Sequence, residues 1–120
     1  LLLGADSAVG VDIDALAVKT ATENGKRNGF EEPQYKVFQG SMTNNVSGKY
    51  DIITANIVAD IIVILCNDIK NYLNDGGVFI TSGIIAPREQ DVLDAFEENA
   101  LEVIERRESG GWLCFEVKSI

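Results

Sequence analysis

Two carboxylates stand one residue apart where an apolar run ends. The stretch "AVGVDIDALAV" covers residues 8–18 and places Asp12 and Asp14 directly after a valine-rich segment. A carboxylate at the end of a buried strand offers paired acceptors and no donor, which suits the two vicinal hydroxyls of a ribose. Asp14 stands where a side chain caps a following helix. We therefore expect Asp12 to bind a ligand, with a solvated strand end as the alternative, and Asp14 to cap a helix.

The chemistry open to this chain is limited by the residues that it lacks. It contains no histidine, which removes the commonest general base and the commonest metal ligand. Its two cysteines, Cys66 and Cys114, are far apart within apolar runs, so we expect core thiols rather than a disulfide. We expect no metal site.

Composition excludes several classes of protein. The 120 residues are 46% apolar and 24% charged, as in a single globular domain. The net charge of −9 argues against a surface that follows nucleic-acid phosphates. This negative charge is compatible with a basic partner or a small-molecule ligand, and it also serves simply to keep a protein soluble. No apolar run is long enough for a membrane helix, and "LLLGADS" lacks the features of a signal peptide, so we expect a cytoplasmic protein without membrane or direct nucleic-acid contact.

Strands and helices alternate along the chain. Runs of apolar or alternating residues predict strands, and helical spacing of apolar residues predicts helices between them. The expected strands are residues 8–13, 34–40, 50–56, 77–83, 101–108 and 112–120, with a loop at 44–49. The expected helices are residues 14–28, a helix from 58 to 73 ended by "NDGG" (74–77), and one that starts near Pro87. The turn at 109–111 predicts a hairpin at the C-terminal end.

This order predicts an α/β fold with one mainly parallel, twisted sheet flanked by helices. The C-terminal hairpin, over residues 101–118, adds an antiparallel pair. A reversed final strand is typical of S-adenosylmethionine-dependent methyltransferases. A nicotinamide-binding domain remains an alternative and would require a longer parallel sheet.

The chain also resembles one family, the ribosomal protein L11 methyltransferases. The segments that carry the resemblance are "VGVDIDALAVKTATENGKRNG", "YDIITANIVADII", "YLNDGGVFITSGII" and "VIERRESGGWLCFEVK". The combination of "ANIVAD" with "TSGI" is the most specific part. The resemblance implies a Rossmann-like, class I S-adenosylmethionine-dependent methyltransferase.

The match begins just after the family's glycine-rich loop. "LLLGADS" resembles the end of the family's first helix, so residues 1–120 look like a partial catalytic domain. The first strand, its loop and the N-terminal substrate-recognition domain have no counterpart. In the methyltransferase topology that strand lies between the strands at 8–13 and 50–56. We therefore expect this chain alone to be inactive, to bind the cofactor weakly and to self-associate through open strand edges or to need the missing segment.

The resemblance assigns cofactor contacts to four residues of the first half. Asp12 matches the acid that binds the ribose of S-adenosylmethionine. Ile13 follows it and is expected against the adenine, with a core isoleucine as the alternative. Ser41 and Met42 follow the strand at 34–40, near the place where many methyltransferases contact the adenine amine.

The acceptor side is assigned in the same way. Asn56 matches an asparagine near both the cofactor and the methyl-accepting nitrogen, with a turn asparagine as the alternative. Ser82 and Gly83 are expected to line the acceptor site, and Gly83 has the alternative role of a turn glycine. Asp60 is expected near a helix start, as a partner of the helix dipole. Trp112 is expected to pack within the hairpin.

The implied reaction is methyl transfer to a lysine or N-terminal amine of a ribosomal protein. Catalysis is then mainly alignment and desolvation, and no general base can be named. Other acceptors stay open: a small amine, a glutamine side chain or a nucleic-acid base. Ile57-Val58 disfavour the planar nitrogens, because those enzymes often carry proline and an aromatic after the asparagine. A non-catalytic fragment or binding module is the alternative of another class.

Overall fold

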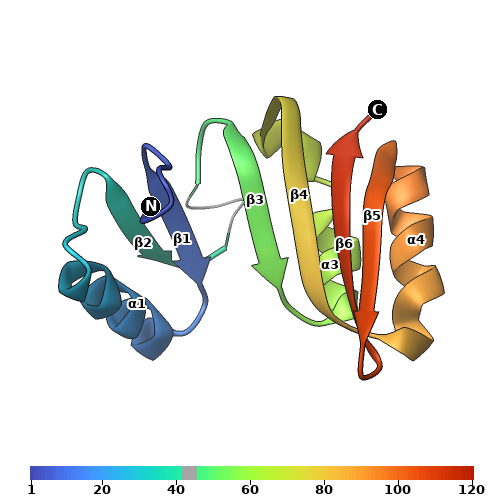
Figure 1. Cartoon of the computed structure of the whole chain (residues 1–120), viewed down its shortest axis with the longest axis horizontal. Helices are drawn as coiled ribbons and strands as arrows, with labels where there is room; N and C mark the ends of the chain where they lie inside the picture. The colour runs from blue at the N-terminus through green and yellow to red at the C-terminus, as the bar shows by residue number, and fades with distance from the viewer. Residues whose placement is uncertain (42–45) are drawn as a thin grey trace. The chain divides into compact units, whose positions relative to one another are not determined.

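The computed structural model describes residues 1–41 and 46–120. The chain divides into two compact units, Leu1–Ser47 and Gly48–Ile120. Figure 1 shows the order of their elements along the chain. Each unit has its own sheet.

The first unit is a β-α-β motif. Strand β1 (Ala8–Asp12), helix α1 (Ala15–Arg27) and strand β2 (Tyr35–Gln39) follow one another as predicted. The strands pair in parallel, in register from Ala8 opposite Tyr35 to Asp12 opposite Gln39. Helix α1 begins at the predicted cap, because the Asp14 carboxylate accepts a hydrogen bond from the Leu16 backbone N–H at 2.9 Å.

A buried glycine joins α1 to β2. A Cβ at Gly25 would lie 2.2 Å from Cε2 of Tyr35, so the tyrosine ring occupies the space that a side chain would need. The Tyr35 hydroxyl donates to the Ala21 carbonyl of the same helix at 3.0 Å. Glycine in a helix interior costs about 1 kcal/mol relative to alanine. Here the cost is offset by close packing of the helix on the strand.

The second unit is a four-stranded sheet with helices. Its elements are β3 (Tyr50–Asn56), α3 (Ala59–Leu65), the 3₁₀ helix η1 (Ile69–Tyr72), β4 (Leu73–Ile85), the 3₁₀ helix η2 (Ala86–Arg88), α4 (Glu89–Glu98), β5 (Leu101–Ser109) and β6 (Trp112–Ser119). The strand order is β3-β4-β6-β5. Strand β3 is parallel to β4, whereas β6 is antiparallel to both β4 and β5. The predicted C-terminal hairpin is therefore confirmed.

The core of this unit lies between one face of the sheet and its helices. In β6, Leu113, Phe115 and Val117 are buried, since alternate side chains of a strand point to the same face. The rings of Phe115 and Phe96 meet edge to face with centroids 5.6 Å apart. The largest fully buried apolar side chains are Phe79, Phe96, Phe115, Ile62, Ile69, Ile84, Leu113, Val92 and Val117.

The prediction of one helix from 58 to 73 was wrong. Helix α3 ends at Leu65, and tight turns follow in which Asn67 N–H bonds to the Ile64 carbonyl and Asp68 N–H to the Leu65 carbonyl. Asparagine and aspartate are poor helix formers because their side chains compete with the backbone. The apolar spacing continued through this break and concealed it.

The segment "NDGG" turns inside a strand instead of ending a helix. Strand β4 already begins at Leu73, and its pairing with β3 jumps from Tyr50–Leu73 to Ile52–Val78. Gly76 has a φ of +77°, a left-handed conformation that glycine adopts readily. The turn residues were identified correctly, but they form an irregularity within β4.

The prediction of one continuous, mainly parallel sheet also needs correction. Strands β1 and β2 form a sheet of two, and the other four strands form a mixed sheet. Among the described residues, β1 pairs with β2 alone and β3 pairs with β4 alone. Each of these strands therefore has one edge with no partner strand in that part of the chain. The α/β class itself is confirmed.

None of the helices within residues 1–41 and 46–120 is long and apolar enough to cross a membrane.

Candidate functional site

Three of the expected cofactor contacts lie at one end of the β1–β2 sheet. Asp12 ends β1 opposite Gln39, and the Gly40 N–H donates to the Asp12 carbonyl at 2.9 Å. Ser41 follows two residues after the end of β2. The parallel register therefore brings Asp12, Ile13 and Ser41 to the same end of this sheet. Met42 lies outside the described residues.

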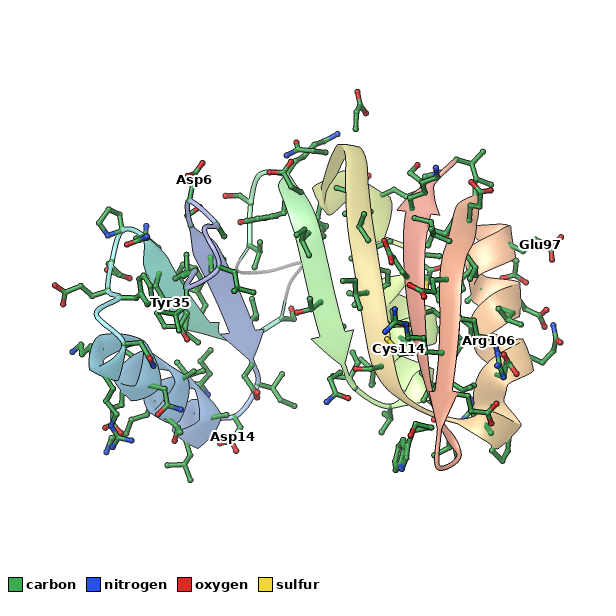
Figure 2. The ribbon with its side chains drawn as sticks, viewed as in Figure 1. Asp6, Asp14, Tyr35, Glu97, Arg106 and Cys114 are labelled. Carbon is green, nitrogen blue, oxygen red and sulfur yellow. The ribbon has the colours of Figure 1, made fainter. Side chains whose placement is uncertain are left out.

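The Asp12 carboxylate is exposed and oriented by the chain itself. Its Oδ1 accepts a hydrogen bond from the Asp14 backbone N–H at 2.9 Å, and Asp14 in turn caps α1. Figure 2 labels Asp14 at the start of α1. Asp14 therefore caps the helix as predicted, whereas the ligand-binding role of Asp12 stays a prediction.

Ile13 is 81% exposed, so its alternative role as a core residue is excluded. Its carbonyl accepts a 3.5 Å hydrogen bond from the Gln39 side chain, which links the ends of β1 and β2. An exposed isoleucine beside an exposed carboxylate is suited to a ligand with an apolar ring and a hydroxylated sugar.

The acceptor-side residues lie at the carboxyl end of the β3–β4 pair. Asn56, the last residue of β3, is in register with Ser82, and the Ile57 N–H donates to the Ser82 carbonyl at 3.2 Å. A Cβ at Gly83 would lie 2.6 Å from Asn56 Oδ1. Gly83 also has a φ of +80°. The Asn56 side-chain oxygen therefore lies so close to the backbone of β4 that a side chain at position 83 would displace it.

An open cleft of about 630 Å³ contains these residues. It is lined by Asn56, Ser82, Gly83, Arg107, Glu108, Ser109, Trp112, Leu113 and Cys114. Trp112 is 56% exposed, so the prediction that it packs within the hairpin was wrong. Our reading of the sequence missed Arg107 and Cys114 as well. The period-two pattern of "WLCFEV" could have placed Trp112 and Cys114 on the face opposite the buried Leu113.

An ion-pair cluster connects α3 with η2 and α4. Arg88 Nη2 lies 2.5 Å from Asp60 Oδ1, and Arg88 Nε lies 2.7 Å from Asp91 Oδ2. The hydrogen bond and the charge of Arg88 hold the pKa of the Asp60 carboxyl below its usual range. Asp60 lies in the first turn of α3, as predicted. It follows Asn56 by four residues, so the cluster lies on the segment that leaves β3.

The parts of the chain described by the structure contain no group of three or more acidic or cysteine side chains placed to hold a metal ion. Each unit contributes its own candidate residues: an exposed carboxylate, Asp12, in the first unit, and an amide, Asn56, beside an aromatic cleft in the second.

Comparison with known proteins decides the family. The family model for "Ribosomal protein L11 methyltransferase (PrmA)" matches residues 1–119. The chain belongs to this family. A ribosomal protein L11 methyltransferase of Clostridium perfringens is 46% identical over 116 residues, which are 97% of this chain and 36% of that protein. One from Dictyoglomus thermophilum is 44% identical over 110 residues, covering 92% of this chain and 36% of its own length.

Solved structures agree with this membership. The ribosomal protein L11 methylase of Lactobacillus delbrueckii subsp. bulgaricus superposes with a TM-score of 0.92 at 30% identity, covering 98% of this chain and 60% of the other. An RNA methyltransferase of Salinibacter ruber, in complex with S-adenosyl-L-homocysteine, gives 0.67 at 16% identity over 92% of this chain and 63% of its own, which shows a shared fold. This member spans about a third of the length of the relatives that it matches.

Proposed function

We propose that this chain is the cofactor- and acceptor-binding part of an S-adenosylmethionine-dependent methyltransferase. The full protein would methylate a lysine or N-terminal amine of a ribosomal protein, in the cytoplasm. Family membership supports the reaction class, and the names of the relatives support ribosomal protein L11 as the substrate. The observation that carries the proposal is the Asn56 amide, which lies against Gly83 and lines an open cleft.

Asp12, Ile13, Ser41 and Met42 would hold the cofactor. The exposed Asp12 carboxylate would accept hydrogen bonds from the two ribose hydroxyls, and the exposed Ile13 side chain would cover one face of the adenine. Ser41 and Met42 would contact the adenine edge. When bound, S-adenosylmethionine supplies a methyl group on a positively charged sulfonium, which is already activated for transfer.

Asn56 would align the acceptor. Its side-chain carbonyl would accept a hydrogen bond from an amine N–H, which directs the nitrogen lone pair along a fixed axis. An amide performs this task without placing a charge beside a sulfonium. The amine must be neutral when it attacks, and the chain contains no histidine to accept its proton. The open cleft would let that proton leave to solvent.

The remainder of the protein would complete the domain. We propose that residues 1–120 form a partial catalytic domain, since the matched relatives are far longer than the matched region. A strand pairing with the open edges of β1 and β3 would join the two sheets, with a glycine-rich loop and a substrate-recognition domain beside it. Taken alone, the 120 residues would bind the cofactor weakly, would be inactive and would self-associate through these edges.

The test uses the full-length protein, S-adenosylmethionine with a labelled methyl group, and purified ribosomal protein L11. Asn56→Ala should lower turnover at least tenfold and leave the affinity for S-adenosylhomocysteine within about twofold, because the amide acts on the acceptor. Asn71→Ala, at an exposed asparagine of η1, is the matched control and should match the parent. Equal turnover for Asn56→Ala and the parent would remove the aligning role. Absence of any methyl transfer by the parent would refute the proposed function.

A further inference from the structure

The exposed indole of Trp112 stands in the same cleft as Asn56. Resting on the proposed function, we infer that Trp112 is a specificity-determining residue for the acceptor. It receives the alkyl stem and the cationic end of an amine side chain before the amine loses its proton. The acceptor class is therefore a lysine-like, flexible alkylamine.

The position of Trp112 follows from the pleat of β6. Leu113, Phe115 and Val117 are buried on the face that packs on the helices. Trp112 and Cys114 alternate with them along β6, and both line the cleft. Tryptophan is a costly residue to leave 56% exposed, because most of its surface is apolar. An exposed aromatic ring that lines a cleft offers a surface on which an apolar or cationic group of a ligand can pack.

The backbone around Trp112 is held in place. The Ala86 N–H donates to the Gly111 carbonyl at 2.9 Å, which ties the hairpin turn to η2. Trp112 is also paired with Ser109 on one side and with Ile85 on the other. The indole is therefore carried by a strand fixed on both edges, so little ordering is needed when a ligand binds.

The charged residues of the cleft are already paired. Glu108 lies 3.1 Å from Arg106, and Arg107 lies 3.0 Å from Glu105. Neither residue leaves an uncompensated charge that would dominate recognition. The indole face then becomes the group that distinguishes one acceptor from another. It attracts an ammonium through its π electrons and packs on methylenes, both of which a lysine side chain supplies together.

The size of the cleft agrees with this ligand. A volume of about 630 Å³ lies within the range of small-molecule sites, roughly 300–1,000 Å³. Asn56 and Ser82-Gly83 belong to β3 and β4, whereas Trp112 belongs to β6. An amine that reaches Asn56 with its nitrogen can thus lay its stem along the wall formed by the hairpin.

The experiment measures steady-state kinetics of the full-length protein with a lysine-containing L11 peptide. Trp112→Ala should raise KM for the peptide about tenfold, which corresponds to the loss of an aromatic contact, and should change kcat less. Affinity for S-adenosylhomocysteine, measured by calorimetry, should stay within about twofold. Trp112→Phe should recover most of the KM, since phenylalanine also presents an aromatic face. Ile104→Ala, at an exposed apolar residue of β5 outside the cleft lining, is the control and should match the parent.

The outcomes separate this inference from the proposed function. A parent enzyme that methylates the peptide while Trp112→Ala keeps the parental KM would overturn the inference and leave the function intact. A parallel loss of cofactor affinity and thermal stability in both Trp112 variants would mean a structural role, and would also overturn it. If Trp112→Ala raised KM for a nucleic-acid acceptor but not for the peptide, the cleft would be assigned to base stacking, and the inference would be overturned. A parent that transfers no methyl group to any amine would defeat the proposed function itself.

Discussion

The side-chain oxygen of Asn56 lies where position 83 can carry nothing larger than hydrogen: a Cβ there would be 2.6 Å from Oδ1. Asn56 ends β3, whereas Gly83 lies within the adjacent parallel strand β4, where its neighbour Ser82 is in register with Asn56. The amide therefore lies directly against the backbone of β4. Alignment of an acceptor depends on such fixed geometry, because small displacements of a positioning group reduce rates strongly.

Gly83→Ala should therefore lower turnover of the full-length enzyme by tenfold or more, with little change in cofactor affinity. The added methyl group would displace the Asn56 amide, and the left-handed backbone would cost about 1–2 kcal/mol of stability. Gly76→Ala is the matched control: its φ of +77° is similar, and a Cβ there meets nothing within 4 Å. Both variants should lose stability, but only Gly83→Ala should lose turnover. Parental turnover in Gly83→Ala would show that the contact does not position Asn56.

Gly25→Ala should destabilise the first unit, although helix propensity alone predicts a gain of about 1 kcal/mol. The reason is the Tyr35 ring, 2.2 Å from the position of the new Cβ. Thermal unfolding of Gly25→Ala, Tyr35→Ala and the double variant would measure the coupling. We expect the glycine substitution to cost less in the Tyr35→Ala background than in the parent. Equal costs in both backgrounds would contradict the packing described here.

The Asp60 carboxyl should titrate below its ordinary pKa of 3.8, because the Arg88 guanidinium hydrogen-bonds to it and stabilises its charged form. A folded pKa below the unfolded one contributes stability that is present above 3.8 and is lost as the pH falls through the folded value. Carbon-detected NMR titration of Arg88→Gln should move the midpoint up toward 3.8. Arg107→Gln, which removes the partner of Glu105, should leave Asp60 unchanged. An Asp60 midpoint unaffected by Arg88→Gln would rule out the ion pair in solution.

The two thiols should differ in reactivity. Burial raises the pKa of the Cys66 thiol to about 11, and its side chain is fully buried, whereas Cys114 is partly exposed in the cleft (labelled in Figure 2). Alkylation requires the thiolate. Iodoacetamide at pH 8 should therefore label Cys114 first and Cys66 only on unfolding, as peptide mass spectrometry would report. Faster labelling of Cys66 would contradict its place in the core.

Sequence patterns predicted the elements that depend on local signals. The capping carboxylate of Asp14 and the alternation in β2 and β6 act over a few residues, so those elements could be identified directly. The break after Leu65 could not, because the apolar spacing runs on through Asn67 and Asp68. The exposure of Trp112 also escaped prediction. Burial of a single side chain depends on what the rest of the fold places over it.

The separation into two sheets also could not be predicted from local sequence patterns. Strand patterns state that a segment is extended, but they do not name its partner. The strands at 8–12 and 50–56 each satisfy one edge by pairing with β2 or β4, and the described residues offer no strand for the other edge. Only the resemblance to a family whose central strand lies between these two strands indicated that they would not pair with each other.

The central claim, that this chain carries the cofactor site of a methyltransferase, depends most directly on Asp12. Calorimetric titration of S-adenosylhomocysteine into the full-length protein should show that Asp12→Ala weakens binding by about 1.5–3 kcal/mol, the range for hydrogen bonds to a charged group. Asp12→Asn keeps a side-chain oxygen that can accept the hydrogen bond from the Asp14 N–H, so this variant controls for the loss of that hydrogen bond. It should weaken binding as well. Affinities equal to that of the parent in both variants would contradict the account.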